Sequence, residues 1–182
     1  TNHCSEIILR SKEFCNLTEI VVREDDTEET LKQKVKLATI LGTWQSTLTN
    51  FKYLNKKWRE NCEEERLLGV SMTGIMDCEL TNATNNGLAE LLRELKQVAI
   101  DTNKEWAKKL NINQSAAITC VKPSGTVSQL VDSASGIHAR HNPYYIRTVR
   151  ADKKDPLAKM MSDAGFPHED DVTKVDHTWV FS

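Results

Sequence analysis

The sequence has few of the residues that break or crosslink a chain. Only 7 of its 182 residues are glycine and 4 are proline, and no low-complexity segment occurs. Its five cysteines are widely scattered, without a CxxC pair or a zinc-ligand spacing, which argues against a disulfide scaffold and against a structural metal site. No apolar run approaches the roughly 20 residues of a membrane span, and no signal peptide is recognisable. We therefore expect a cytoplasmic protein with no membrane partner and no metal.

The charges are nearly balanced. Lysine and arginine total 24 against 26 aspartates and glutamates, for a formal net charge of −2. This balance argues against a nucleic-acid partner, which needs a clustered basic face, but it leaves room for a local pocket that takes a phosphorylated small molecule. A chain of this length suits one domain that buries roughly 70% of its unfolded surface. We expect a single unit over residues 1–182.

The two ends indicate an excerpt of a longer polypeptide. The sequence has no initiator methionine, and residues 177–182 are typical of a strand that has barely begun. Because a domain rarely stops inside an apolar strand, we expect further chain beyond this sequence.

Strands and long helices alternate along the chain. A short β-rich run with little alternation predicts a buried strand at residues 18–22, and apolar runs predict buried strands at residues 67–76 and 116–121. Apolar residues at helical spacing predict helices at residues 26–50 and 87–110 between them. This alternation is typical of a parallel α/β architecture.

Three local patterns complete this outline. Asp26 is expected to cap the first helix, with Glu29 completing a capping box. Farther along, alternating residues predict a strand at residues 144–149. Residues 156–164 predict a short helix that Gly165 ends.

A polar triplet stands at the start of the chain. In an extended segment residues two apart share one face, so Asn2, Cys4 and Glu6 would place a thiol between an amide and a carboxylate. Such a set suits chemistry on a hydroxylated substrate, with Glu6 as proton acceptor and Asn2 as a hydrogen-bonding clamp. Composition alone favours the simpler alternative, a fraying terminus with three unrelated polar residues.

A turn of small polar residues follows the third predicted strand. It consists of Pro123, Ser124, Gly125 and Thr126. Such a turn offers exposed backbone N–H groups and hydroxyls, and a helix that starts there would add partial positive charge, which suits phosphate. It is not a Walker A loop, because the glycine and lysine spacing of that motif is absent. An ordinary strand-to-helix turn is the alternative.

Two histidines and two arginines lie in or close to the predicted strand at residues 144–149: His138, Arg140, His141 and Arg147. These residue types bind anions or metals. Histidines three positions apart in a loop are weak evidence for a metal, so the pattern favours solvated loop residues.

Taken in order, these segments resemble the ribonucleotide reductases. That family carries an Asn-x-Cys-x-Glu loop, a second cysteine shortly after it, and a Pro-Ser-Gly-Thr-like phosphate loop. The matching residues are Asn2, Cys4 and Glu6, then Cys15, then Pro123 to Thr126. Residues 132–138 and 144–150 are similar to the monomeric, cobalamin-dependent (class II) enzymes that reduce ribonucleoside triphosphates. The resemblance covers nearly the whole chain.

The resemblance implies a fold and a mechanism. The fold would be α/β, the C-terminal part of a ribonucleotide-reductase-type ten-stranded α/β barrel. Adenosylcobalamin would generate a thiyl radical on Cys4, which removes the ribose 3′ hydrogen. Glu6 would take the 3′-hydroxyl proton and Asn2 would hold the substrate hydroxyls. Cys15 would be one half of the dithiol that supplies reducing equivalents.

The resemblance also implies ligands and partners. Ser124, Gly125 and Thr126, next to Pro123, would bind the phosphates of a ribonucleotide that is reduced for DNA precursor synthesis. A thioredoxin-like protein would re-reduce the dithiol, and a deoxynucleotide effector is allowed. The other half of the dithiol and much of the cofactor apparatus lie outside this sequence, so the excerpt alone is expected to be inactive. One departure is His3, where the class II enzymes usually have proline.

The mechanism separates the five cysteines into two groups. Cys4 and Cys15 are expected in one cleft, about one ribose apart and too far for the close sulfur contact of a disulfide. Cys62, Cys78 and Cys120 are expected elsewhere, as small apolar or incidental residues.

Two alternatives stay open. The first is the large subunit of an iron-dependent (class I) reductase, which needs a separate radical-generating subunit. Tyr144 and Tyr145 invite that interpretation, but they follow the phosphate loop too closely to be that family's relay pair. The second is a non-catalytic nucleotide-binding module. The set Asn2, Cys4 and Glu6 argues against it, because binding alone has no use for a thiol there.

Overall fold

The computed structural model describes residues 4–82 and 85–182. Where the sequence led us to expect one unit, contacts divide the chain into two, unit 1 (Thr1–Arg140) and unit 2 (His141–Ser182). Residues 137–148 contain neither helix nor strand and are all exposed, which is the usual character of a boundary between compact units. Each unit is described by itself.

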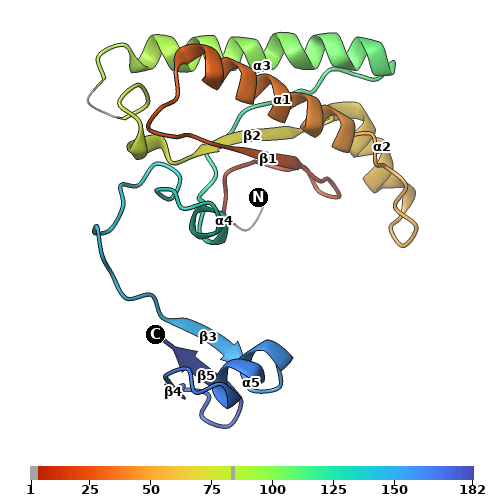
Figure 1. The fold of residues 1–182 in the computed structure, drawn as a ribbon. Helices are drawn as coiled ribbons and strands as arrows, with labels where there is room; N and C mark the ends of the chain where they lie inside the picture. Colours follow the sequence, from red (N-terminus) through yellow and green to blue (C-terminus); the bar gives the residue numbers. More distant parts are fainter. Residues whose placement is uncertain (1–3, 83–84) are drawn as a thin grey trace. The chain divides into compact units, whose positions relative to one another are not determined.

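Unit 1 is built on two parallel strands, β1 (Asn16–Val21) and β2 (Leu68–Thr73) (Figure 1). The predicted third strand also runs along β2. The N–H of Cys120 donates to the carbonyl of Val70, and the pairing is a single parallel bridge between Val70 and Thr119 rather than a full strand. The parallel α/β architecture predicted from the sequence is confirmed for this unit.

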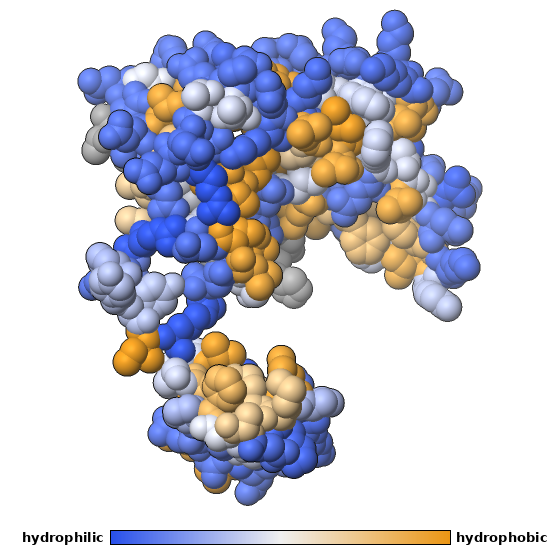
Figure 2. All heavy atoms as spheres, in the orientation of Figure 1, coloured by the Kyte–Doolittle hydropathy of each residue, from blue (hydrophilic) through white to orange (hydrophobic). Residues whose placement is uncertain are grey.

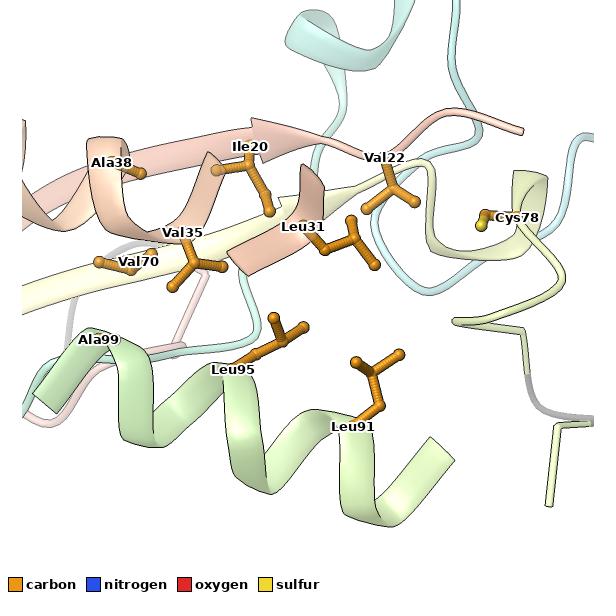
Figure 3. Packing of buried hydrophobic residues seen from close by; sticks show 10 residues of the cluster. All are labelled: Ile20, Val22, Leu31, Val35, Ala38, Val70, Cys78, Leu91, Leu95 and Ala99. Carbon is orange, nitrogen blue, oxygen red and sulfur yellow. The ribbon is translucent and has the colours of Figure 1, made fainter. Parts of the chain in front are cut away.

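Two long helices, α1 (Glu28–Gln45) and α3 (Leu88–Leu110), pack with these strands around one apolar cluster (Figures 1 and 3). The buried members of the cluster are Ile20, Val22, Leu31, Val35, Ala38, Val70, Cys78, Leu91, Leu95 and Ala99. Full burial of an aliphatic side chain stabilises a fold by about 1.5–3 kcal/mol. The cluster therefore fixes both helices against the same face of the strands.

Helix α1 begins later than the sequence predicted. Thr27 is its N-cap, and Thr27 and Thr30 form the capping box that the sequence assigned to Asp26 and Glu29. The carboxylate of Asp26 is buried and lies 2.5 Å from the ammonium of Lys34. A buried carboxylate needs a charged partner more than a helix terminus needs a cap, so the assignment of Asp26 as the N-cap is wrong.

The sequence did not predict helix α2 (Lys56–Glu65). Its residues, KKWRENCEEE, offer only Trp58 and Cys62 as apolar side chains at helical spacing, and its buried side chains are Asn61 and Cys62. The helix ends at Arg66, which has a left-handed φ of 49° and donates its N–H to the carbonyl of Cys62. The guanidinium of Arg66 donates to the carbonyl of Ser46 at 2.5 Å. Polar contacts, together with the packing of Trp58 on Phe14, hold α2 in place.

Two short helical elements complete unit 1, the 3-10 helix η1 (Ile75–Asp77) and α4 (Thr126–Leu130). Arg140 forms ion pairs with Asp77 at 3.1 Å and with Asp132 at 2.7 Å. Hydrogen bonding to Arg140 lowers the pKa of Asp132. Within the described residues, no group of three or more histidine, cysteine, aspartate or glutamate side chains is arranged to hold a metal ion.

Unit 2 contains one helix and a three-stranded antiparallel sheet. In spatial order the strands are β3 (Val149–Asp152), β5 (Thr178–Phe181) and β4 (His168–Asp170), and the helix is α5 (Pro156–Asp163). Strand β5, which the sequence predicted only as the start of a strand, is the central one and pairs on both edges. The short helix predicted at residues 156–164 is confirmed, with Asp155 as its N-cap.

The strand predicted at residues 144–149 is wrong apart from its last residue. Residues 144–148 lie outside any strand and are exposed. A strand needs a hydrogen-bonded neighbour, and the ladder of unit 2 begins only at the pair Val149 and Phe181. The alternation of side chains at residues 144–148 is therefore not sufficient to form a strand without a paired neighbour.

The surface carries hydrophobic side chains among mainly hydrophilic ones (Figure 2). On α1 the exposed apolar side chains include Leu37 and Leu41, and Leu48 is exposed three residues after the end of the helix. Among the described residues, no helix combines the length and the apolar character needed to cross a membrane.

Candidate functional site

The predicted catalytic residues belong to the segment that leads into β1. Cys4 is exposed, Glu6 is half-buried, and Cys15 is half-buried directly before the first residue of β1. Asn2 lies outside the described residues. The segment therefore carries a thiol open to the surroundings at one end and a shielded thiol at the other.

Three segments meet over Gly69 in β2. Val70 belongs to the cluster under the helices, and neighbouring residues of a strand face opposite sides, so Gly69 faces away from the helices. A Cβ placed at this position would lie 2.5 Å from Cδ2 of Leu17, 2.9 Å from Cδ1 of Ile7 and 3.1 Å from Sγ of Cys120. Side chains from the Cys4 segment, from β1 and from the third strand fill this space, so only glycine fits between them.

Cys120 thus lies with the predicted catalytic segment, and the expectation that it lies elsewhere is wrong. Burial, followed by the carboxylates of Glu6 and Glu19, raises the pKa of the Cys120 thiol to about 11. The other two thiols behave differently. Cys78 is part of the apolar cluster, as predicted, and Cys62 is buried on α2.

Cys15 shares the neighbour Glu6 with Cys120. Burial, followed by the charges of Cys120 and Glu6, raises the pKa of the Cys15 thiol to about 12. Because such interactions act at short range, these three groups occupy one region. Both thiols keep their protons at neutral pH.

One carboxylate oxygen of Glu6 lacks a donor. Its Oε2 is buried and accepts no hydrogen bond from the part of the chain that the structure describes. A buried acceptor without a partner is costly, which favours a ligand that brings a donor. A substrate hydroxyl next to two protonated thiols would satisfy this oxygen.

The predicted phosphate loop starts three residues after Cys120. Pro123 is exposed, Ser124 is buried, and Gly125 and Thr126 are exposed where α4 begins. The loop therefore enters the site from the end of the third strand.

This loop keeps several hydrogen-bond donors for a ligand. Within the described residues, the backbone N–H groups of Ser124, Gly125 and Thr126 have no acceptor, and the hydroxyl of Ser124 is buried without a partner. The carbonyl of Ser124 accepts hydrogen bonds from the hydroxyls of Ser128, at 2.9 Å, and Ser135. These hydrogen bonds engage a carbonyl group of the loop. They leave the N–H groups named above available to a ligand.

We expect Cys15 and Cys120 to resist alkylation near neutral pH. Only the thiolate reacts, and raising the pKa from 9.0 to about 12 lowers the thiolate fraction of Cys15 about a thousandfold; the fraction of Cys120 falls about a hundredfold. Iodoacetamide labelling read by mass spectrometry should show both rates still rising above roughly pH 10 in the folded protein. The same thiols in urea should level off near their ordinary pKa.

These shifts also set a pH window for stability. Above pH 9.0 the unfolded chain releases protons that the folded chain still holds, so the free energy of unfolding should fall as the pH rises towards 12.

Labelling of both thiols at neutral pH as fast as in the unfolded chain would contradict the raised pKa values of Cys15 and Cys120.

Cys120 and Gly69 are the site residues that sequence reasoning missed. A signal existed for Cys120, which stands at the carboxyl end of a predicted parallel strand, directly before the Pro123 loop; such ends carry ligand sites in α/β proteins. Gly69 had only the weaker signal of a glycine inside a strand.

The chain is similar to several proteins of known class. No family model matches it. It is 30% identical to the adenosylcobalamin-dependent ribonucleoside-triphosphate reductase of Lactobacillus gasseri, over 94% of this chain and 26% of that protein. It is 32% identical to the enzyme of the same name from Euglena gracilis, over 91% of this chain and 22% of that protein.

A solved structure agrees with these relatives. The crystal structure of a B12-dependent (class II) ribonucleotide reductase matches 99% of this chain and 28% of that chain, with a TM-score of 0.73 and 27% identity. In sequence and in structure, the chain matches part of a class II ribonucleotide reductase. The class II resemblance and the fold predicted as part of the reductase barrel are therefore confirmed, and the iron-dependent alternative is not favoured.

The chain spans about a quarter of the length of the curated class II reductases it matches. The predicted roles of Cys4, Glu6 and Cys15 in such a reductase stay predictions.

Proposed function

We propose that the complete polypeptide carrying this chain is an adenosylcobalamin-dependent reductase that converts ribonucleoside triphosphates to 2′-deoxyribonucleotides for DNA synthesis. The observation that carries the proposal is the buried, unpartnered Oε2 of Glu6 beside two protonated thiols. A carboxylate acceptor next to thiol donors suits the removal of one hydroxyl proton and the loss of a neighbouring hydroxyl as water.

Cys4 is the residue at which this chain would meet the cofactor. Its thiol is exposed, which fits a sulfur that must be reached by a group held elsewhere in the polypeptide. When bound, adenosylcobalamin supplies the radical. The thiyl radical on Cys4 would then remove the ribose 3′ hydrogen, while Glu6 takes the proton of the 3′-hydroxyl.

Cys15 would supply one half of the reducing dithiol. A thiol with a pKa of about 12 gives up a proton only to a strong acceptor, such as the departing 2′-hydroxyl, and is not lost as a free thiolate. With a second thiol from elsewhere in the polypeptide, it provides two electrons and two protons, so that water leaves and a disulfide forms. A thioredoxin-like protein would reduce that disulfide between turnovers.

Substrate recognition would combine the phosphate loop with the start of the chain. The unused N–H groups of Ser124, Gly125 and Thr126, following Pro123, would bind the substrate phosphates. Asn2 would hold the substrate hydroxyls. A deoxynucleotide effector would bind outside this chain.

The compartment that suits this chemistry is the cytosol. All five cysteines are free thiols in the structure, and a dithiol that cycles needs a compartment that keeps thiols reduced.

The test is the cofactor dependence of the complete polypeptide, purified without any partner protein. We expect deoxyribonucleotide formation from a ribonucleoside triphosphate only when adenosylcobalamin and a dithiol reductant are both present. Activity that needs a second, iron-containing subunit would contradict the class II proposal. Nucleotide binding without any product under these conditions would favour the non-catalytic module instead.

A further inference from the structure

The segment before Cys15 has no regular structure to fix its position. Residues 5–15 contain neither helix nor strand. Ser5 and Lys12 adopt left-handed φ values of 58° and 63°, a conformation that residues with a side chain rarely take without support from their surroundings. The position of Cys15 therefore depends on the elements that hold this segment.

Asn61 of α2 holds the turn in this segment. Its side chain is buried, and its amide nitrogen donates to the carbonyl of Ser11 at 2.9 Å and to that of Lys12 at 3.2 Å. Both donors of one amide thus bind two successive carbonyls, one of them at the residue with the left-handed φ. Without this amide the two carbonyls would lose their donors and the turn its support.

Cys62 follows Asn61 in α2 and contacts the same segment at Phe14, the residue before Cys15. Its sulfur accepts the N–H of Phe14 at 3.3 Å. The ring of Phe14 stacks on Trp58 of the same helix, with centroids 4.6 Å apart, and meets Phe51 edge-on at 5.2 Å. Helix α2 therefore contacts both the backbone and the side chain of Phe14.

Ion pairs also connect this segment to α2, but they stabilise its position less. Arg10 lies 3.2 Å from Glu64 and 2.9 Å from Glu65, both near the end of α2. The side chain of Arg10 is 40% exposed, and ion pairs at such positions are screened by water and salt. The buried amide and sulfur are thus the stronger determinants of where the segment lies.

We propose that Asn61 and Cys62 are positioning residues, which hold residues 11–14 against α2 so that Cys15 meets the substrate in the geometry that reduction requires. The inference rests on the proposed function of Cys15. Neither residue bonds to Cys15 itself; both act through the backbone that precedes it.

The test compares Asn61→Ala with Asn113→Ala in the complete polypeptide. Asn113 is a matched control, because its amide also donates to α2, to the carbonyls of Glu63 and Glu64 at 3.2 and 3.3 Å, and its bonds do not reach the segment. We expect Asn61→Ala to speed Cys15 alkylation about tenfold and to lower kcat about tenfold to a hundredfold with KM unchanged, since misplacement of a reacting group by about 1 Å costs rate. Asn113→Ala should change neither quantity.

A second pair of variants covers the case in which Asn61→Ala fails to fold. Cys62→Ser keeps an acceptor for the N–H of Phe14, and Cys62→Ala removes it, while both remove the thiol. We expect kcat and the Cys15 alkylation rate of the serine variant to stay close to wild type, and those of the alanine variant to follow Asn61→Ala.

Three outcomes would count against the proposed roles of Cys62 and Asn61 or against the proposed function. Equal losses in Cys62→Ser and Cys62→Ala would overturn the role of Cys62 as an acceptor. Wild-type Cys15 alkylation and kcat in folded Asn61→Ala would overturn the role of Asn61. If the wild-type polypeptide made no deoxyribonucleotide, the proposed function would fall, while the alkylation rates would still decide whether α2 positions Cys15.

Discussion

Replacing Cys4 with serine is expected to abolish deoxyribonucleotide formation by the complete polypeptide, even in a single turnover. A serine hydroxyl holds its hydrogen too strongly to carry the radical that removes the ribose 3′ hydrogen, so no later step begins. Product would be measured by chromatography after mixing enzyme, ribonucleoside triphosphate and adenosylcobalamin, with a loss of at least about a thousandfold, the scale of removing a residue that takes part in chemistry.

Because Cys4 is exposed, the Cys4→Ser substitution should remove the thiol without disturbing the fold. An exposed side chain contributes little to the core, so the melting temperature should stay within about 1–2 °C of wild type. Nucleotide binding should also persist, since the phosphate loop lies on another segment. If Cys4→Ser retained wild-type reduction, the assignment of the radical site would be wrong and the proposed function would fall with it.

Replacing Cys15 with serine is expected to block product formation while leaving cleavage of the cofactor intact. In the proposed mechanism the thiol of Cys15 donates in reduction, after the radical has formed, so its loss would act on the later step. Absorption spectroscopy of the cofactor, followed in parallel with product analysis, separates the two steps. We expect the first signal to stay near wild type and the second to disappear.

The neighbouring thiol provides the control for this result. Cys120 lies in the same region as Cys15 and has a similarly raised pKa, so Cys120→Ser tests whether the loss of any thiol in this region blocks product formation. We expect Cys120→Ser to retain product formation. Loss of cofactor cleavage in Cys15→Ser would contradict the assigned order of events and would place Cys15 in radical formation instead.

The sequence predicted those elements whose residues carry their own pattern. Helix α3 shows apolar residues at helical spacing over its whole length, β1 ends in β-branched residues, and β2 is a short run of mainly apolar residues. Such patterns arise because a helix or a strand covered by other elements must turn apolar side chains towards the core. Their order along the chain was sufficient to predict parallel α/β architecture.

The elements that the sequence did not predict depend on distant partners. Helix α2 has too few apolar residues to predict a helix, because only Trp58 and Cys62 join the polar Asn61 on the face that contacts the segment before β1. The first turn of α1 was assigned to Asp26, whose carboxylate is engaged by Lys34 instead. In each case a polar contact made on folding outweighs the local pattern.

By itself, the sequence determined the residue types that can carry the chemistry, Cys4, Glu6 and Cys15 and the turn at residues 123–126, together with the strand and helix order that supports them. Only the tertiary structure decided which groups meet. It brings Cys120 over Gly69, beside the segment that carries the predicted catalytic residues, and it sets Cys62 against Phe14 across 48 positions of sequence. The physical reason is that strand pairing and helix packing join residues far apart in the chain, whereas spacing and side-chain type describe only neighbours.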